Sequence, residues 1–207
     1  MHEQIDHPCV QHKLAIIRDV DTGHKRFREL ATEITKFLCY EALKNIKVKE
    51  IEVQTPLAKA SCNKIDTDLV VVPILRAGVG MLEGILELVP TARVGFVGLY
   101  RNEETKQPVS YYQRFPPQTK GGTCIIVDPM LATGGSTIAA IDLLKESGAG
   151  QIVVVCIVTC LEGLGLVEKA HPDVPVYTAS IDDKLDENKY IVPGLGDAGD
   201  RLFGTSH

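Results

Sequence analysis

Short apolar runs rich in valine and isoleucine constrain the fold of this chain more than any other feature. Each run is too short for a long buried helix, and none alternates polar with apolar residues as a strand with one wet face would. Continuous runs of this kind suit the central strands of a parallel sheet that is covered on both faces. They are Leu69 to Leu75, Arg93 to Leu99, Cys124 to Val127, Ile152 to Thr159 and Val174 to Ser180.

Stretches with helical character separate several of these runs. They are Gly80 to Leu88, Gly135 to Glu146 and Gly163 to Ala170. Upstream, the apolar spacing predicts an amphipathic helix over Lys25 to Asn45, and Glu50 to Gln54 alternates like a short strand. Strands that alternate with helices predict an α/β fold, with a mostly parallel central sheet and helices on both faces. Pro108 to Pro116 is expected to form an extended arm or a hairpin.

Length and charge narrow the class of protein. The 207 residues contain no repeat, low-complexity tract or linker, so we expect one domain over residues 1–207. The 22 basic and 27 acidic residues give a net charge of −5, which disfavours a nucleic acid as the main partner. The first residues lack the pattern of a signal peptide, and the longest apolar stretch, Ile152 to Leu161, is short of the roughly 20 residues that cross a bilayer. We therefore expect a soluble, cytoplasmic protein without a membrane partner.

The cysteines give no sign of a disulfide framework or a metal site. The six cysteines are scattered without a Cys-x-x-Cys pair, so free thiols in a reducing compartment are expected. His7, Cys9 and His12 lie close together, but no second cluster of ligands completes a zinc site. We expect no metal held by protein ligands alone.

The most informative loop follows the run that ends at Val127. In open α/β sheets, ligands bind at the carboxyl ends of the strands, where this loop lies. Its Thr-Gly-Gly-Ser-Thr turn over residues 133–137 lets successive N–H groups converge at a helix start, and its three hydroxyls add donors. This pattern predicts a phosphate cradle, although an ordinary turn with a Ser or Thr cap is the alternative. Asp128, at the end of the strand, is then placed to accept hydrogen bonds from sugar hydroxyls.

Two arginines also follow apolar strands directly. Arg76 comes after Leu75 and precedes small residues, and Arg101 comes just past Leu99. A guanidinium group at such a position binds phosphate groups well. Arg101 alone is more typical of a solvated loop residue, whereas for Arg76 an exposed surface arginine is the alternative. Together with the cradle, they suit a substrate that carries both a phosphate and a diphosphate.

The C-terminal run from Tyr190 to Arg201 contains a literal Gly-x-Gly-x-x-Gly motif over residues 194–199. Too few residues follow it for the βαβ unit that gives this motif its meaning in dinucleotide binding. Its small residues still allow the backbone to approach a flat ligand closely.

With these segments assembled, the sequence resembles the uracil branch of the phosphoribosyltransferases, from His7 to Gly204. The most specific motifs are Asp-Pro-Met-Leu-Ala-Thr-Gly-Gly-Ser over residues 128–136 and Gly-Leu-Gly-Asp-Ala-Gly-Asp-Arg over residues 194–201. Pro129 stands where many phosphoribosyltransferases carry a second acid. The chain departs from the family at Thr159 to Gly163, which lacks a proline that the family usually has there. The resemblance therefore leaves open the shape of this loop and any effector response that depends on it.

The resemblance implies transfer of ribose 5-phosphate from 5-phosphoribosyl 1-diphosphate (PRPP) to uracil, which gives UMP and diphosphate in pyrimidine salvage. It implies a phosphoribosyltransferase-type sheet with a small hood or arm region. It gives catalytic roles to Arg76, Arg101, Asp128 and Asp197. It assigns PRPP to Arg76, Arg101, Asp128, Pro129, Met130, Leu131, Ala132, Thr133, Gly134, Gly135, Ser136 and Asp197. It assigns uracil to Ile191, Gly196, Asp197 and Ala198.

The resemblance also implies partners beyond the two substrates. Mg²⁺ would accompany the diphosphate. At least a dimer is expected, with Pro108 to Pro116 as a candidate interface, and GTP is a candidate effector.

Two rival functions stay open. One is a regulator of the same fold that binds RNA, which the net charge of −5 disfavours. The other is an enzyme that acts on a purine, which Pro129 and the Gly-Asp-Ala loop disfavour.

Overall fold

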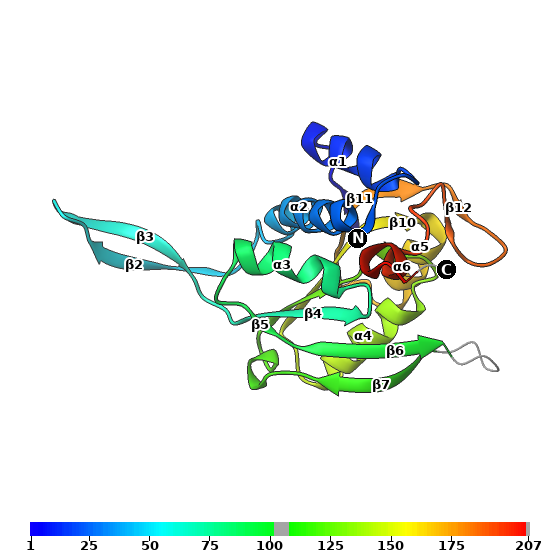
Figure 1. Cartoon of the computed structure of the whole chain (residues 1–207). Coiled ribbons are helices and arrows are strands. Elements are labelled where there is room, and N and C mark those ends of the chain that lie inside the picture. Colours follow the sequence, from blue (N-terminus) through cyan, green and yellow to red (C-terminus); the bar gives the residue numbers. More distant parts are fainter. Residues whose placement is uncertain (102–107, 206–207) are drawn as a thin grey trace.

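A central sheet organises the molecule (Figure 1). The computed structural model describes residues 1–101 and 108–205. Its sheet has the strand order β1-β11-β10-β8-β4-β6-β7, parallel throughout except for β7, and two short strands, β5 and β9, pair with β4 and β10. The strands are β1 (His2–Gln4), β4 (Leu69–Leu75), β5 (Arg93–Val94), β6 (Phe96–Arg101), β7 (Pro108–Arg114), β8 (Thr123–Val127), β9 (Met130–Leu131), β10 (Gln151–Cys160) and β11 (Val176–Asp182).

Helices cover both faces of this sheet, as the sequence predicts. Neighbouring strand residues divide between two cores: Val71 and Ile125 pack with α1, α2, α3 and α6, whereas Val70 and Ile126 pack with α4 and α5. Because both faces are dry, the strands need no polar positions, which explains their unbroken apolar runs. The helices are α1 (Pro8–Arg18), α2 (His24–Ala42), α3 (Val79–Leu88), α4 (Gly135–Glu146), α5 (Leu161–Ala170) and α6 (Ala198–Phe203).

Several elements differ in detail from the sequence expectation. The expected strand over Arg93 to Leu99 is divided at Gly95, where a Cβ atom would lie 2.9 Å from the ring of Phe115. The helix expected over Lys25 to Asn45 is α2, which ends at Ala42. Pro108 to Arg114 forms β7, the antiparallel hairpin partner of β6 at the edge of the sheet.

The projecting arm is a different hairpin, β2 (Val48–Gln54) with β3 (Lys59–Ile65), which extends away from the sheet (Figure 1). A second small antiparallel pair, β12 (Lys184–Leu185) with β13 (Ile191–Val192), follows β11. The short 3₁₀ turn η1 (Pro117–Thr119) leads into β8. No helix in residues 1–101 and 108–205 is long and apolar enough to span a membrane.

The N-terminal helix α1 was not anticipated, although its start has a clear local cause. The His7 side chain accepts a hydrogen bond of 3.1 Å from the N–H of Cys9, and Pro8 occupies the first turn. A proline there loses no intrahelical bond, and a side-chain acceptor satisfies a free N–H group. The close spacing of His7 and Cys9 thus serves helix capping.

Truncation of a central strand residue should destabilise the fold strongly. Ile126 on β8 is fully buried, so Ile126→Ala should lower the free energy of unfolding by about 2–5 kcal/mol through lost burial and a residual cavity. Leu57, at the tip of the β2–β3 hairpin, is 97% exposed, and Leu57→Ala should change it by less than about 0.5 kcal/mol. Urea unfolding of the two variants measures the difference, and equal values would contradict the two-sided core.

Candidate active site

The strand order brings the predicted site loops together at the carboxyl ends of neighbouring strands, which form one edge of the sheet. Strand β8 lies between β4 and β10, with Val127 in register with Pro73 on one side and Val155 on the other. All three strands are parallel, so the loop after each begins at the same edge. The Arg76 loop and the Asp128 loop are therefore neighbours.

Strand β6 carries the other predicted arginine to this edge. It pairs with the opposite side of β4 and ends at Arg101. The side chain of Arg101 lies outside the part of the chain that the structure describes.

The loop after β8 is fixed to its neighbouring strand β10. The carbonyl of Pro129 accepts hydrogen bonds of 3.0 Å from the N–H groups of Ile157 and Val158, and β9 continues this pairing. The Thr159 hydroxyl then donates to the carbonyl of Leu131 at 2.8 Å.

The next carbonyl of the loop, that of Ala132, accepts a hydrogen bond of 3.4 Å from the Cys160 thiol. Thr159 and Cys160 belong to the segment where the sequence departs from its family. Sequence reasoning did not foresee that this segment holds the loop, and the one available signal was the hydroxyl of Thr159 at the end of an apolar run.

The turn into α4 has the geometry that the sequence predicts for an anion site. Gly134 caps the helix with φ +76°, a left-handed conformation that favours glycine. Its carbonyl accepts from the N–H of Ile138 at 2.8 Å, which begins the helical ladder and leaves the first N–H groups pointing out of the helix start. Such groups, with the helix dipole, attract a phosphate.

The predicted hydroxyls divide between the surface and the interior. Ser136 is exposed and Thr133 is partly exposed. Thr137, in contrast, is only 2% exposed, so it adds little to the exposed surface of this turn.

Asp128 has an unusual electrostatic position at the start of this loop. Burial raises the pKa of its carboxyl group to about 7, although a hydrogen bond of 3.5 Å from the N–H of Met130 opposes the shift. A carboxyl group held this way gains strongly from donors or a cation, because either stabilises its charged form. This fits contact with sugar hydroxyls or with a cation.

The structure joins Arg76 to the C-terminal segment. Its Nη2 atom lies 3.5 Å from Oδ1 of Asp200, and the arginine side chain is 62% exposed. Gly199 lies beside it, since a Cβ atom there would be 3.8 Å from Nη2 of Arg76. The peptide bond between Leu75 and Arg76 is cis. Sequence reasoning predicted both segments, and the structure brings them into contact.

The loop predicted to bind the base presents its backbone. Gly196 is exposed with φ +73°, and Asp197 is exposed and caps α6 by accepting from the N–H of Asp200 at 2.9 Å. Among the described residues, no hydrogen bond involves the N–H or carbonyl of Gly196. Ala198, by contrast, is buried.

Ile191 does not line this surface with its side chain, because that side chain is 4% exposed and belongs to the core. Arg18 and Asp182, which sequence reasoning did not single out, form hydrogen bonds to the backbone of this loop, as does Arg201, the last residue of the motif over residues 194–201. An arginine on α1 gave no signal that could link it to a loop so distant in sequence.

A parallel sheet with an acid, a glycine turn and an arginine at neighbouring strand ends defines the phosphoribosyltransferase class. An adenine phosphoribosyl transferase from Trypanosoma brucei has the same fold, with a TM-score of 0.56 at 16% identity over 90% of this chain and 87% of that one.

The model of the uracil phosphoribosyltransferase family matches residues 4–205, and the chain belongs to this family. Relatives with this name come from Symbiobacterium thermophilum, 52% identical over 97% of both chains, and Clostridium perfringens, 53% identical over 98% of this chain and 97% of that one. A solved structure from Aquifex aeolicus has a TM-score of 0.94 at 40% identity and covers 100% of this chain and 99% of that one.

The raised pKa of Asp128 gives the protein a defined pH response. The native state binds a proton that the unfolded state releases between the usual carboxyl pKa and about 7, so this group lowers stability as pH rises through that range. Asp128→Asn removes the effect. The melting temperature of the variant should therefore exceed that of the wild type by more at pH 8.5 than at pH 5.0, as measured without ligand. A difference that shrinks with rising pH would contradict the assignment.

Proposed function

We propose that this chain transfers ribose 5-phosphate from PRPP to uracil, with UMP and diphosphate as products. The observation that carries the proposal is the meeting of Arg76 with the Gly199–Asp200 segment beside the Asp128 loop. Groups suited to a diphosphate, a ribose phosphate and a flat base then border one another. The membership of the chain in the uracil phosphoribosyltransferase family supports the same reaction.

The ribose 5-phosphate would lie on the loop from Asp128 to Ser136. The N–H groups at the start of α4 and the hydroxyls of Thr133 and Ser136 would bind the 5-phosphate. The carboxylate of Asp128 would accept hydrogen bonds from the two ribose hydroxyls. The backbone of Pro129, Met130, Leu131 and Ala132 shapes the loop through its bonds to β10.

The leaving diphosphate would be bound by Arg76 and Arg101. An exposed pair such as Arg76 with Asp200 stabilises a protein by less than about 1 kcal/mol, so the guanidinium can turn to an anion at little cost. As the C1–O bond breaks, negative charge grows on the diphosphate and positive charge on the ribose ring. Guanidinium groups that contact the diphosphate stabilise that leaving charge, which lowers the barrier.

The same substrate suits a magnesium ion. Mg²⁺ is commonly held by one or two carboxylates together with substrate phosphates and water. Asp128 fits this role because its carboxyl group follows β8, beside the strand β4 that leads to Arg76. When bound, the ion would neutralise charge on the diphosphate.

Uracil would lie against the backbone of Gly196, Asp197 and Ala198. The backbone of Ile191, in β13, would lie nearby. Backbone donors and acceptors at fixed positions distinguish the O4 and N3–H edge of uracil from the reversed edge of cytosine. Holding the base in line with C1 lets its N1 atom form the new bond as the old bond breaks. Asp197 is a candidate to steer the N1 proton of uracil and also reaches the PRPP side.

A UMP-formation assay with PRPP, Mg²⁺ and a panel of free bases tests the proposal directly. The expected result is product with uracil and far less with cytosine, hypoxanthine or adenine. A preference for a purine would contradict the proposal and support the rival function, an enzyme that acts on a purine. Salt-sensitive RNA binding without UMP formation would support the regulator instead.

The proposal also covers the domain organisation, location and assembly of the protein. We infer that residues 1–207 work as one domain in the cytoplasm and assemble at least as a dimer. The edge strand β7 is a candidate interface, since it exposes Tyr111 and Tyr112. Light scattering would give the mass of the assembly, and an assay with and without GTP would test that effector.

Loss of Arg76 should slow turnover more than it weakens binding of uracil. Arg76→Ala removes a guanidinium that acts as the diphosphate leaves, so kcat should fall roughly 100-fold or more. Arg93→Ala is the matched control, because Arg93 also makes an exposed ion pair, with Asp68, but lies at the start of the short strand β5. Steady-state kinetics should show the loss only at Arg76. A raised KM for uracil with normal kcat would contradict this role.

Two glycines of α5 allow a sharp test of the Asp128 loop. A Cβ atom on Gly163 would lie 2.1 Å from the carbonyl oxygen of Ala132, so Gly163→Ala must displace this loop and should raise the KM for PRPP about tenfold or more. A Cβ atom on Gly165 meets nothing within 4 Å. Gly165→Ala should therefore keep normal kinetics and raise stability by up to about 1 kcal/mol. Equal KM values for PRPP would show that the loop does not bind that substrate.

A further inference from the structure

A partly buried ion pair connects the N-terminal helix to the start of the loop from Gly194 to Ala198. The guanidinium of Arg18, at the end of α1, donates to both carboxylate oxygens of Asp182 at 2.7 and 2.6 Å. The hydroxyl of Ser180 lies between them, 2.9 Å from Arg18 and 2.7 Å from Asp182. The Asp182 side chain is 2% exposed.

This pair holds both polar atoms of one backbone residue, Gly194. Nη1 of Arg18 donates to the Gly194 carbonyl at 2.6 Å, and the Gly194 N–H donates to Oδ2 of Asp182 at 2.8 Å. Gly194 has φ +57°, and a Cβ atom there would lie 2.0 Å from the carbonyl oxygen of Ile191. Its orientation is thus set by two hydrogen bonds and by a backbone contact.

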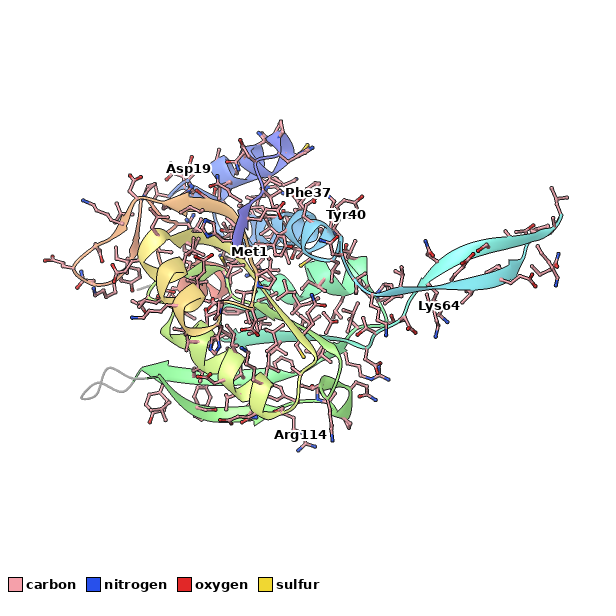
Figure 2. All side chains as sticks on the ribbon, turned by 180° about the vertical axis from the view of Figure 1, so that it is seen from behind. Met1, Asp19, Phe37, Tyr40, Lys64 and Arg114 are labelled. Carbon is pink, nitrogen blue, oxygen red and sulfur yellow. The ribbon has the colours of Figure 1, made fainter. Side chains whose placement is uncertain are left out.

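A second arginine holds the next residue of the loop. Arg201 donates to the carbonyl of Leu195 at 2.9 Å and to the carbonyl of Asp19 at 2.5 Å. Its guanidinium also lies 4.5 Å from the centre of the Phe27 ring. Figure 2 shows Asp19 just after α1, near the end of β11, where Arg18 meets Asp182. The end of α1 therefore meets the loop through both arginines.

We propose that Arg18 is a positioning residue for uracil, because with Asp182 it fixes Gly194 and so directs the backbone from Gly196 to Ala198 toward the base. The inference rests on the function proposed above. Arg18 would touch neither substrate. Side chains hold the carbonyls of Gly194 and Leu195. The next residue, Gly196, makes no hydrogen bond through its N–H or carbonyl to any residue that the structure describes, so both groups are available to a ligand.

The charge state of Asp182 favours its ion pair with Arg18 over the neutral pH range. Burial alone would raise the pKa of Asp182, but hydrogen bonds from Arg18, Ser180 and Gly194 outweigh it and hold the pKa below its usual value. The carboxylate is thus ionised throughout the neutral range. Removal of Arg18 leaves that charge buried without its partner, so a simple substitution changes stability as well as geometry.

The test compares Arg18→Ala with the double variant R18A/D182N. The double variant leaves no buried charge without a partner, and its asparagine oxygen still accepts from the Gly194 N–H. Arg26→Ala is the control, since Arg26 makes exposed ion pairs with Glu29 and Glu33 on α2. Steady-state kinetics with each substrate varied and the melting temperature are measured for all four proteins, wild type included.

We expect kcat/KM for uracil to fall roughly 10- to 100-fold in both variants, with the KM for PRPP within about threefold of wild type. The melting temperature should fall in Arg18→Ala and recover in the double variant, while the KM for uracil stays raised. Recovery of the KM together with the melting temperature, an unchanged KM for uracil, or an equal rise of both KM values would overturn the proposal. Failure of the function itself is distinct, because the wild type would then form no UMP.

Discussion

The burial of β8 between two parallel neighbours and two layers of helices is the constraint on which the site depends. Because β4 and β10 run parallel to it, their final residues emerge at the same edge as Asp128. Both faces of these strands are filled by apolar side chains, so the polar groups of the site can lie only in the loops. The same burial that stabilises the sheet therefore brings together the Asp128 loop, with its glycine turn, and the Arg76 loop.

The loops at this edge are held mainly through their backbones. In the loop after β8, the carbonyls of Pro129, Leu131 and Ala132 accept hydrogen bonds from residues of β10. In the loop before α6, the carbonyls of Gly194 and Leu195 accept hydrogen bonds from Arg18 and Arg201. A loop fixed by its own carbonyls keeps its remaining N–H groups and side chains for a ligand, which is the preorganisation that catalysis by positioning requires.

Much of the fold followed from the sequence, because the signals that decide it are local. The unbroken apolar runs identify strands that are covered on both sides, and the expected α4 over Gly135 to Glu146 has the same bounds in the structure. The arm was less predictable. The exposed hairpin β2–β3 buries little, so its second strand leaves no apolar pattern, and the choice between an arm and a sheet edge for Pro108 to Pro116 depended on pairing with β6.

The sequence by itself determined the family, the class of fold and most candidate residues of the site, because glycines, hydroxyls and charges next to strand ends mark binding loops by their chemical type. Only the tertiary structure decided which of them reach the surface and which of them meet. It turned the Ile191 side chain and Thr137 into the interior and brought Arg76 to Asp200. It also joined Arg18 to Gly194. Contacts between segments so distant in sequence follow from strand order and helix packing, which no local pattern of residues encodes.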